Sequence, residues 1–172
     1  MGGKLLRGFV DGALSTLGIV VGASSASPLL IVAAAAGGTL ANGISNALGA
    51  FSAERADDYA ELRRVEKAMV DREMKESMLE HSMHRRSMVA GGVDALGTIS
   101  GGALPLIPYL VGSGSPALIA SIALVIVSVS AVGLYLGKLS KRNLVFSACK
   151  MAVSGGVVAA VVYGIQWAIV PS

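Results

Sequence analysis

The sequence predicts an all-α integral membrane protein, with five transmembrane helices and a charged cytoplasmic helical insert between the second and the third. Of its 172 residues, 53% are hydrophobic and only 15% are charged, whereas ordinary soluble domains carry about 25% charged residues. The 22 glycines suit helices that pack closely in lipid. Nearly all of the charge lies in one block, which divides the chain into residues 1–52, 53–87 and 88–172.

Two apolar segments precede the charged block. Residues 5–52 contain only two charged side chains, Arg7 and Asp11, and a polar stretch that ends at Pro28 divides these residues. Each half has about 20 to 24 residues, which is enough to cross about 30 Å of hydrocarbon. We therefore expect two spans here. A cleaved signal peptide is the alternative for the first span, although Asp11 inside its apolar region argues against cleavage.

Three further apolar segments follow the block, at residues 87–112, 116–137 and 144–170. A Gly-Ser-Gly-Ser-Pro stretch separates the first of them from the second, and a basic stretch separates the second from the third. Each segment is long enough to form a transmembrane helix. Together with the two segments before the block, they predict five spans.

The positions of Lys and Arg predict the orientation, because short cytoplasmic loops carry an excess of basic residues. With a cytoplasmic N-terminus, the basic N-terminal segment, the 53–87 insert and the loop at 138–142 all lie on the cytoplasmic side. The loops at 23–28 and 112–116 carry no charge. We expect the C-terminus to lie outside the cell or in a lumen. The net charge of +3 then reflects orientation in membrane lipid, and we expect no nucleic-acid partner.

Two acidic side chains lie within the predicted spans, Asp11 and Asp94. A carboxylate inside a membrane is costly, so it normally faces a partner or a water-filled path. The functional hypothesis is that Asp11 lines such a path and that Asp94 is a secondary intramembrane acid. The alternative, which is stronger for Asp94, is a carboxylate that stays hydrated near the interface or pairs with Arg7 or Lys150.

The second span carries Ser45 and two asparagines, Asn42 and Asn46, whose spacing places both amides on one helical face. If their carbonyl oxygens face Asp11, they complete an oxygen-rich site for a hydrated divalent cation. Hydrogen bonds between helices are the alternative. The glycines of the first two spans predict that these two helices pack closely: Gly8, Gly12, Gly18, Gly22, Gly37, Gly38 and Gly43.

The charged insert predicts one long helix or a bent pair, since no Gly or Pro occurs between residues 50 and 90. Carboxylate and imidazole groups recur on one face at one-turn spacing, which suits Fe²⁺, Mn²⁺ or Zn²⁺. The candidate metal ligands are Glu73, Glu76, Glu80 and His84, with Met78 and His81 close by. Opposite charges four residues apart favour the alternative of a solvated helix, and the methionines could simply be packing residues.

Three segments resemble the vacuolar iron transporter family in order along the chain. Residues 7–22, RGFVDGALSTLGIVVG, are similar to its Arg-x-x-x-Asp-Gly opening. Residues 102–112, GALPLIPYLVG, resemble its Pro-Leu-x-Pro-Tyr third span. Residues 155–166, GGVVAAVVYGIQ, resemble its Gly-x-x-Ala-Ala-x-x-Tyr fifth span. The long charged insert falls between the second and third spans, as it does in that family.

This resemblance implies a homodimer of five-helix subunits that moves Fe²⁺, and often Mn²⁺, out of the cytoplasm in exchange for protons. It implies that Asp11 lines the path, that the insert collects the metal, and that the protein is not an enzyme and has no cofactor besides the metal it carries. The second span departs from the family pattern, because Asn46 and Ala50 stand where the family has Met and Glu. An amide in place of a thioether favours a harder cation such as Mn²⁺.

The competing hypothesis is a non-transporting membrane protein, in which the charged cytoplasmic helix binds a partner or mediates dimerisation. An intramembrane enzyme has little support. The predicted spans contain no Ser/His pair and no His-Glu-x-x-His cluster, and both histidines lie in the insert. The single Cys149 excludes an internal disulfide and a Cys-rich zinc site.

Overall fold

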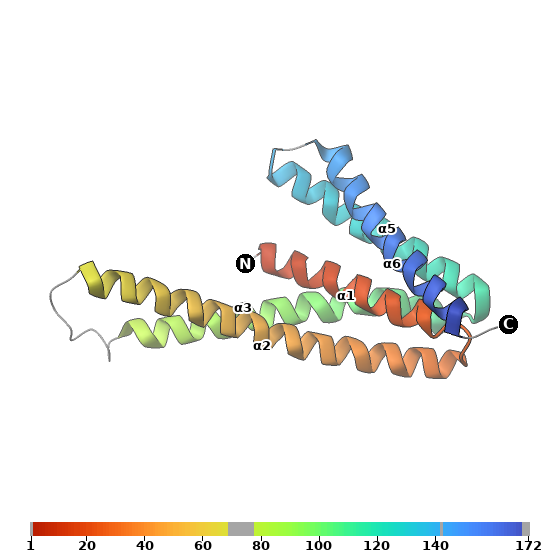
Figure 1. Cartoon of the computed structure of the whole chain (residues 1–172), viewed down its shortest axis with the longest axis horizontal. Helices are drawn as coiled ribbons and strands as arrows, with labels where there is room; N and C mark the ends of the chain where they lie inside the picture. Colours follow the sequence, from red (N-terminus) through yellow and green to blue (C-terminus); the bar gives the residue numbers. More distant parts are fainter. Residues whose placement is uncertain (1, 69–77, 142, 170–172) are drawn as a thin grey trace.

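A computed structural model describes residues 2–68, 78–141 and 143–169, without the side chains of residues 62, 65–68 and 78–82. Within these ranges all regular structure is helical and no strand occurs (Figure 1), so the prediction of an all-α fold is confirmed. The elements are α1 (Gly2–Gly22), α2 (Pro28–Ala68), α3 (Met78–Ala103), the 3-10 helix η2 (Leu104–Leu106), α4 (Ile107–Val111), α5 (Gly114–Leu139) and α6 (Leu144–Ile169).

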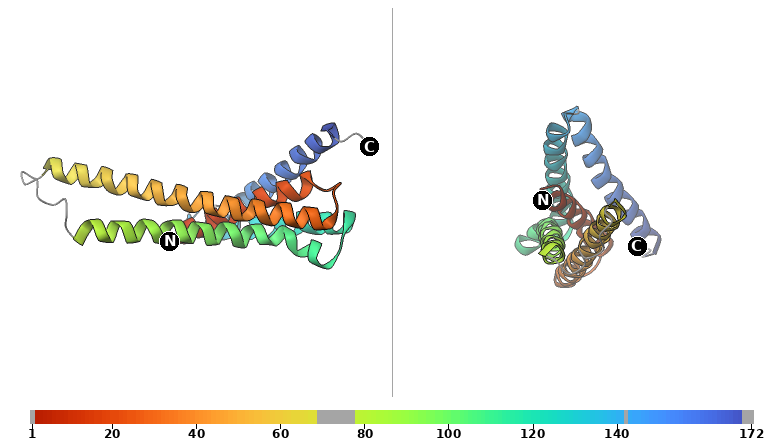
Figure 2. Two further views of the ribbon diagram at one scale, coloured as in Figure 1. Left: turned by 90° about the horizontal axis from the view of Figure 1, so that it is seen from below. Right: turned by 90° about the vertical axis from the view of Figure 1, so that its left-hand side faces the viewer.

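Helices α1, α2 and α3 lie side by side, and the pair α5 and α6 packs against α1 at an angle (Figure 1, Figure 2). Helices α1 and α3 run in the same direction, and α2 runs opposite to both. The α5–α6 pair lies close to the C-terminal end of α1 and diverges from it toward the N-terminal end. Helix α1 therefore contacts every other long helix of the described chain.

Glycines hold α1 and α3 close together along their parallel course. Gly8 and Gly12 of α1 lie against the α3 backbone at Asp94 and Thr98, and a Cβ at either glycine would overlap backbone atoms. The contact is reciprocal, because two glycines of α3 lie in the same way against α1 at Leu5 and Phe9: Gly97 and Gly101. Two small residues four positions apart allow this close approach of helices.

The prediction that the glycines bring the first two spans together was therefore wrong for most of them. Gly8 and Gly12 face α3, and Gly43 of α2 also faces α3 at Ile99. A Cβ at Gly37 would meet no atom of the described residues within 4 Å. Only Gly38 brings α2 against α1, at Ile19. Sequence spacing shows which residues share a face, but it does not show which helix covers that face.

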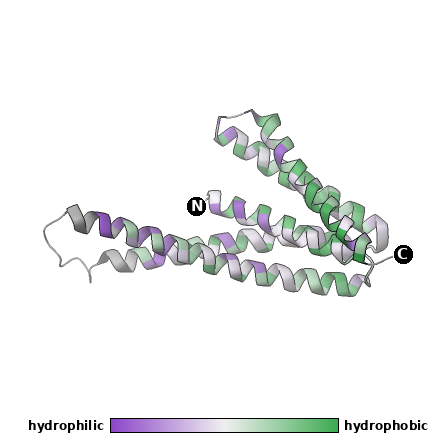
Figure 3. Ribbon diagram, viewed as in Figure 1, coloured by the Kyte–Doolittle hydropathy of each residue, from purple (hydrophilic) through white to green (hydrophobic). Residues whose placement is uncertain are grey.

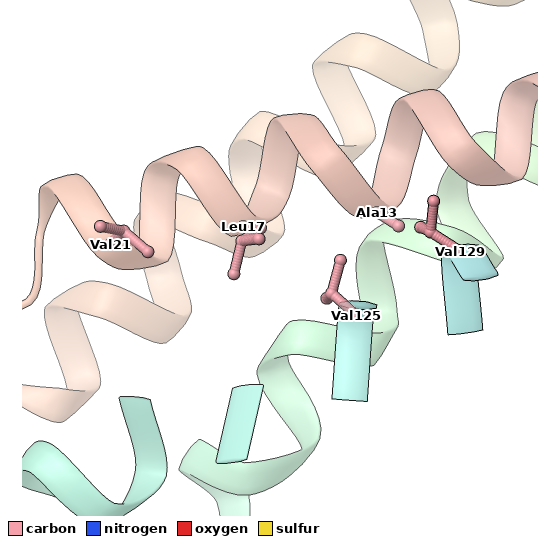
Figure 4. Packing of buried hydrophobic residues seen from close by; sticks show 5 residues of the cluster. All are labelled: Ala13, Leu17, Val21, Val125 and Val129. Carbon is pink, nitrogen blue, oxygen red and sulfur yellow. The ribbon is translucent and has the colours of Figure 1, made fainter. Parts of the chain in front are cut away.

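Two apolar clusters join α1 to its neighbours. In the first, Ala13, Leu17 and Val21 of α1 pack on Val125 and Val129 of α5, and all five are buried (Figure 4). The second joins the far end of α1 to α2, α4 and α5 through Val20, Ile31, Ala35, Tyr109 and Ala117. Both clusters use the faces of α1 that point away from Asp11, which leaves that residue exposed.

Four helical segments are long and apolar enough to cross a membrane: α1, Pro28–Glu61 within α2, α5 and α6. The expected third span, at residues 87–112, is not one continuous helix. It consists of the end of α3, then η2 and α4, and the change of helix type occurs where Pro105 and Pro108 lack the N–H donors of a regular helix. The count of five spans stays a prediction.

The described parts of the insert belong to two helices rather than to one. Helix α2 continues through residue 53 to Ala68, and α3 begins at Met78, so both helices cross the expected boundaries at 53 and 87 without a break. Their extensions lie side by side past the start of α1 (Figure 1), and the part of the α2 extension that Figure 3 colours is largely hydrophilic. We call residues 53–68 and 78–87 the α2–α3 hairpin.

Candidate functional site

Asp11 lies at the centre of a polar cluster between α1 and α2. It is exposed on α1, and its Oδ2 accepts hydrogen bonds from Nδ2 of Asn42 at 3.0 Å and from Nδ2 of Asn46 at 2.6 Å. The two asparagines are one turn apart on α2, so both side chains reach the same carboxylate. The two asparagines share a face, as their spacing predicted, and their contacts with Asp11 are hydrogen bonds between helices, the alternative given for these residues.

Two hydroxyl groups extend the cluster, one on α1 and one on α3. Nδ2 of Asn42 also donates to Oγ of Ser15 at 2.9 Å, and Nδ2 of Asn46 also donates to Oγ1 of Thr98 at 2.9 Å. Thr98 is buried and donates in turn to the backbone oxygen of Asp94 at 3.0 Å. We call the set Asp11, Ser15, Asn42, Asn46 and Thr98 the amide cluster. It fixes the rotamer of each amide and links the three helices α1, α2 and α3.

The orientation of the amides differs from the expectation. Their nitrogen atoms, and not their carbonyl oxygens, face Asp11. The physical reason is that an ionised carboxylate has no hydrogen to donate, so without a cation it is satisfied by N–H groups. Both amides use the same oxygen, and Oδ1 of Asp11 accepts no hydrogen bond from the described residues. A half-turn of either amide would present its carbonyl oxygen instead.

Ser45, another candidate for this site, lies on α2 beside Asn46. It is exposed, and its hydroxyl makes no hydrogen bond within the part of the chain that the structure describes. Its position is therefore next to the amide cluster but outside its network. Ser15 and Thr98, which sequence reasoning missed, take part in the network instead. The sequence carries a signal for Ser15 alone, because Ser15 follows Asp11 by four residues and so shares its helical face.

Asp94 lies apart from Asp11 and is paired with Arg7. Its side chain is fully buried, and the guanidinium of Arg7 donates from Nη2 to Oδ2 at 2.8 Å and from Nε to Oδ1 at 3.4 Å. Because α1 and α3 run in parallel, the ion pair lies on the N-terminal side of the amide cluster. This contact corresponds to the ion-pair interpretation of Asp94, with Arg7 rather than Lys150 as the partner.

A second ionic contact joins the same three helices where the hairpin begins. Glu54 of α2 forms an ion pair with Lys4 of α1. It forms a second one with Arg86 of α3, whose Nε lies 3.0 Å from Oε1 of Glu54. Sequence reasoning placed Glu54 and Arg86 in the charged insert and Lys4 in the basic N-terminal segment, and it missed the contact. Their spacing along the chain carries no signal of it, because each residue comes from a different helix.

Of the metal-ligand candidates in the insert, only His84 has a side chain that the structure describes. Glu73 and Glu76 lie outside the described residues, and Met78, Glu80 and His81 lie in α3 but their side chains are outside the description. His84 is exposed and packs edge to face on the ring of Phe51, with ring centroids 5.6 Å apart. Among the described residues, no group of three or more His, Cys, Asp or Glu side chains is placed to hold a metal ion.

One more acidic side chain of the hairpin was not singled out from the sequence. Asp58 of α2 is buried, and its Oδ2 has no hydrogen-bond partner among the described residues. Close by, Arg55 packs over the rings of Phe51 and Tyr59 and donates to the Tyr59 hydroxyl at 2.8 Å. These contacts order one face of α2 beyond the apolar part of the helix.

Several long apolar helices, one of which carries a hydrogen-bonded carboxylate, define a multi-pass helical membrane protein. Residues 51–167 match the model of the VIT family, and the chain belongs to this family of vacuolar iron transporters. It is 38% identical over 165 residues to an uncharacterized protein of Methanocaldococcus jannaschii, a match that covers 94% of this chain and 86% of the relative. Family membership indicates metal-ion transport. The family match begins within α2, so it does not include the amide cluster residues before residue 51.

Proposed function

We propose that this protein is a transporter of divalent metal cations, which moves Fe²⁺ or Mn²⁺ out of the cytoplasm in exchange for protons. Membership in the VIT family supports metal-ion transport. The observation that carries the proposal is the Asp11 carboxylate, which is exposed on an apolar helix and held on one oxygen by Asn42 and Asn46. A charge within a membrane helix is costly unless it serves a polar path.

The free oxygen of Asp11 is the proposed ligand of the cation. Oδ2 accepts both amide hydrogens, so Oδ1 remains for the metal, and water together with a reoriented amide carbonyl completes an oxygen shell. Oxygen ligands suit Mn²⁺ better than softer ions. Protonation of Asp11 would release the cation, because a carboxylate must be deprotonated to bind a metal.

A second copy of the chain is the proposed cover for this exposed carboxylate. Small exposed residues follow the neighbouring face of α2 over several turns: Ala34, Gly37, Ala41, Ser45 and Gly49. Such residues let helices of two subunits approach closely. In a two-fold homodimer joined here, two Asp11 carboxylates lie near the axis and line one path. Most of α6 presents exposed apolar side chains, which membrane lipid would cover.

The proposed orientation places the N-terminus and the α2–α3 hairpin in the cytoplasm. The supporting observation is that basic residues gather at these positions and at the turn between α5 and α6, whereas the opposite ends of the helices carry none. In this orientation the hairpin meets cytoplasmic metal first. Its Glu, His and Met residues are the proposed collecting groups, and Asp11 is the proposed intramembrane ligand.

The hairpin itself favours a second candidate function, that of a non-transporting membrane protein. Its helices project past the start of α1, and the contacts of Glu54 with Lys4 and Arg86 anchor it to the bundle (Figure 1). A rigid, charged projection of this kind would bind a soluble partner or join two copies of the chain. This function needs no cation at Asp11, so the two candidates predict different results for an Asp11 variant.

Mn²⁺ uptake into proteoliposomes tests the proposal. We expect Asp11→Asn to lower the initial rate by about tenfold or more, since second-shell changes alone cost about 10- to 100-fold at metal sites. Asp57→Asn is the matched control, because Asp57 is an exposed acid of the hairpin and the substitution is the same. Uptake by Asp11→Asn at the rate of the unmodified protein would remove Asp11 from the mechanism. No uptake by the unmodified protein would favour the second function.

A further inference from the structure

The guanidinium of Arg7 is paired with the carboxylate of Asp94, while the proposed cation ligand Asp11 lies one turn further along α1. On α1, Arg7 precedes Asp11 by four residues, so the two side chains share a face, and the charge of Arg7 acts on Asp11 as well as on Asp94. The hydrogen bonds of Arg7 nevertheless go to Asp94 of α3, at 2.8 and 3.4 Å. The structure thus has a fixed cation one turn from the proposed cation site.

Asp94 is what holds Arg7 in this position. The Asp94 side chain is 0% exposed, whereas the Arg7 side chain is 67% exposed, so the surrounding protein does not enclose the guanidinium. Moving Arg7 away would leave a buried carboxylate without a compensating charge, which is costly, so Asp94 retains the guanidinium. Thr98 connects the two sites, because it contacts Asn46 and donates to the Asp94 backbone.

A released Arg7 would compete with a metal ion for Asp11. Side chains four residues apart on a helix have Cβ atoms about 5 to 6 Å apart, well within the reach of an arginine. The Oδ1 atom of Asp11 accepts no hydrogen bond from the described residues and is therefore open to the guanidinium. Pairing would occupy the oxygen proposed for the metal and cancel the charge that attracts it.

We propose that Asp94 is a positioning residue for cation binding: it holds Arg7 away from Asp11, and an Arg7 that is not held by Asp94 is a tethered competitor of the divalent cation at Asp11. This inference rests on the proposed function of Asp11 as a cation ligand. If the ion pair had only a structural role, removing Asp94 would weaken cation binding with or without Arg7. Under this proposal, removing Asp94 weakens cation binding only when Arg7 is present.

Mn²⁺ binding to the purified full-length chain in detergent, measured by calorimetry, tests the inference. The part of the Mn²⁺ binding that is lost in the Asp11→Asn variant is assigned to Asp11. We expect Asp94→Asn to weaken this binding by about tenfold, within the usual range for coupling between two sites. The double variant Arg7→Gln/Asp94→Asn lacks the competitor, and we expect it to bind Mn²⁺ at least as tightly as the unmodified chain.

The Lys4 and Glu54 pair supplies the matched control. Lys4 is seven residues before Asp11, about 10 Å along the helix, and it also pairs with an acid of another helix. We expect the double variant Lys4→Gln/Glu54→Gln to leave Asp11-dependent binding within about twofold of the unmodified chain, because neither residue makes a hydrogen bond to the amide cluster or to Arg7 among the described residues.

The outcomes separate the two proposals. If the unmodified chain shows no Asp11-dependent Mn²⁺ binding, the proposed function and this inference both fail. If the unmodified chain binds and the double variant Arg7→Gln/Asp94→Asn binds about tenfold more weakly, Arg7 is not a competitor and the inference alone fails. This second comparison does not require Asp94→Asn to fold, so a poorly folded single variant leaves the test intact.

Discussion

Asn46 is the residue of the amide cluster whose chemistry matters most for the cation. Its Nδ2 donates to Asp11 at 2.6 Å and to Thr98 at 2.9 Å, so one amide joins the exposed carboxylate of α1 to a buried hydroxyl of α3. An amide can reverse its donor and acceptor ends, which a thioether cannot. Asn46 therefore satisfies Asp11 in the absence of metal and can offer an oxygen in its presence.

Replacing Asn46 with Asp should make the cluster depend on metal. Two carboxylates would then face each other at hydrogen-bonding distance, which destabilises the chain without a cation and strengthens cation binding. With saturating Mn²⁺, we expect the rise in melting temperature to exceed that of the unmodified chain by about 4 °C, corresponding to about tenfold tighter binding. Differential scanning fluorimetry in detergent, with and without Mn²⁺, measures the difference.

Asn143→Asp is the control for this variant. It makes the same change of charge and shape in the exposed turn before α6, away from the amide cluster. We expect its response to Mn²⁺ to equal that of the unmodified chain. An equal response from Asn46→Asp would contradict the assignment of Asn46 to the cation site.

At the level of elements, the close pair of α1 and α3 positions the site. Gly8 and Gly12 on one helix and Gly97 and Gly101 on the other bring the two backbones into contact. This contact fixes how far α1 is shifted along α3. The shift brings Arg7 beside Asp94, and it places Asp11 and Thr98 where Asn46 contacts both. The apolar clusters on the remaining faces of α1 hold the same alignment.

Replacing Gly12 with a residue that has a Cβ should disturb the packing of α1 against α3. The added atom would overlap the backbone of Thr98, which cannot move without displacing α3. We expect Gly12→Ala to lower the free energy of unfolding by about 1 to 3 kcal/mol, as overpacked cores do. Gly164→Ala in α6 is the control, because no atom of the described residues lies within 4 Å of a Cβ at that position, and it should be neutral or stabilising by up to about 1 kcal/mol. Equal effects of the two substitutions in unfolding experiments would contradict the packing described here.

At the level of the whole molecule, the chain is a bundle of apolar helices with one charged hairpin that extends past it (Figure 3). Length and hydropathy predicted this division because membrane helices need long apolar segments and charges are excluded from them. Helical spacing also predicted that Asn42 and Asn46 share a face. Asp11 was the candidate to face them because acids are rare in the predicted spans, where only one other occurs.

Other features could not be predicted, because they depend on which helices become neighbours. Gly8 and Gly12 could equally have faced α2, and nothing in their spacing indicates α3. The contacts of Glu54 with Lys4 and Arg86 join residues that are far apart in the chain. For Asp94 the sequence offered Arg7 and Lys150 as partners but could not decide between them. The break near Pro105 was visible as a motif, but an apolar segment with two prolines can still continue as a kinked helix in a membrane.

The central claim is that the exposed carboxylate of Asp11 binds the transported cation where two copies of the chain meet. Anomalous diffraction from crystals of the full chain soaked in Mn²⁺ tests it most directly. The account predicts a peak in contact with Oδ1 of Asp11, near a two-fold axis that relates two α1 helices, and the loss of that peak in Asp11→Asn. Manganese on the α2–α3 hairpin alone, with none at Asp11, would contradict the claim.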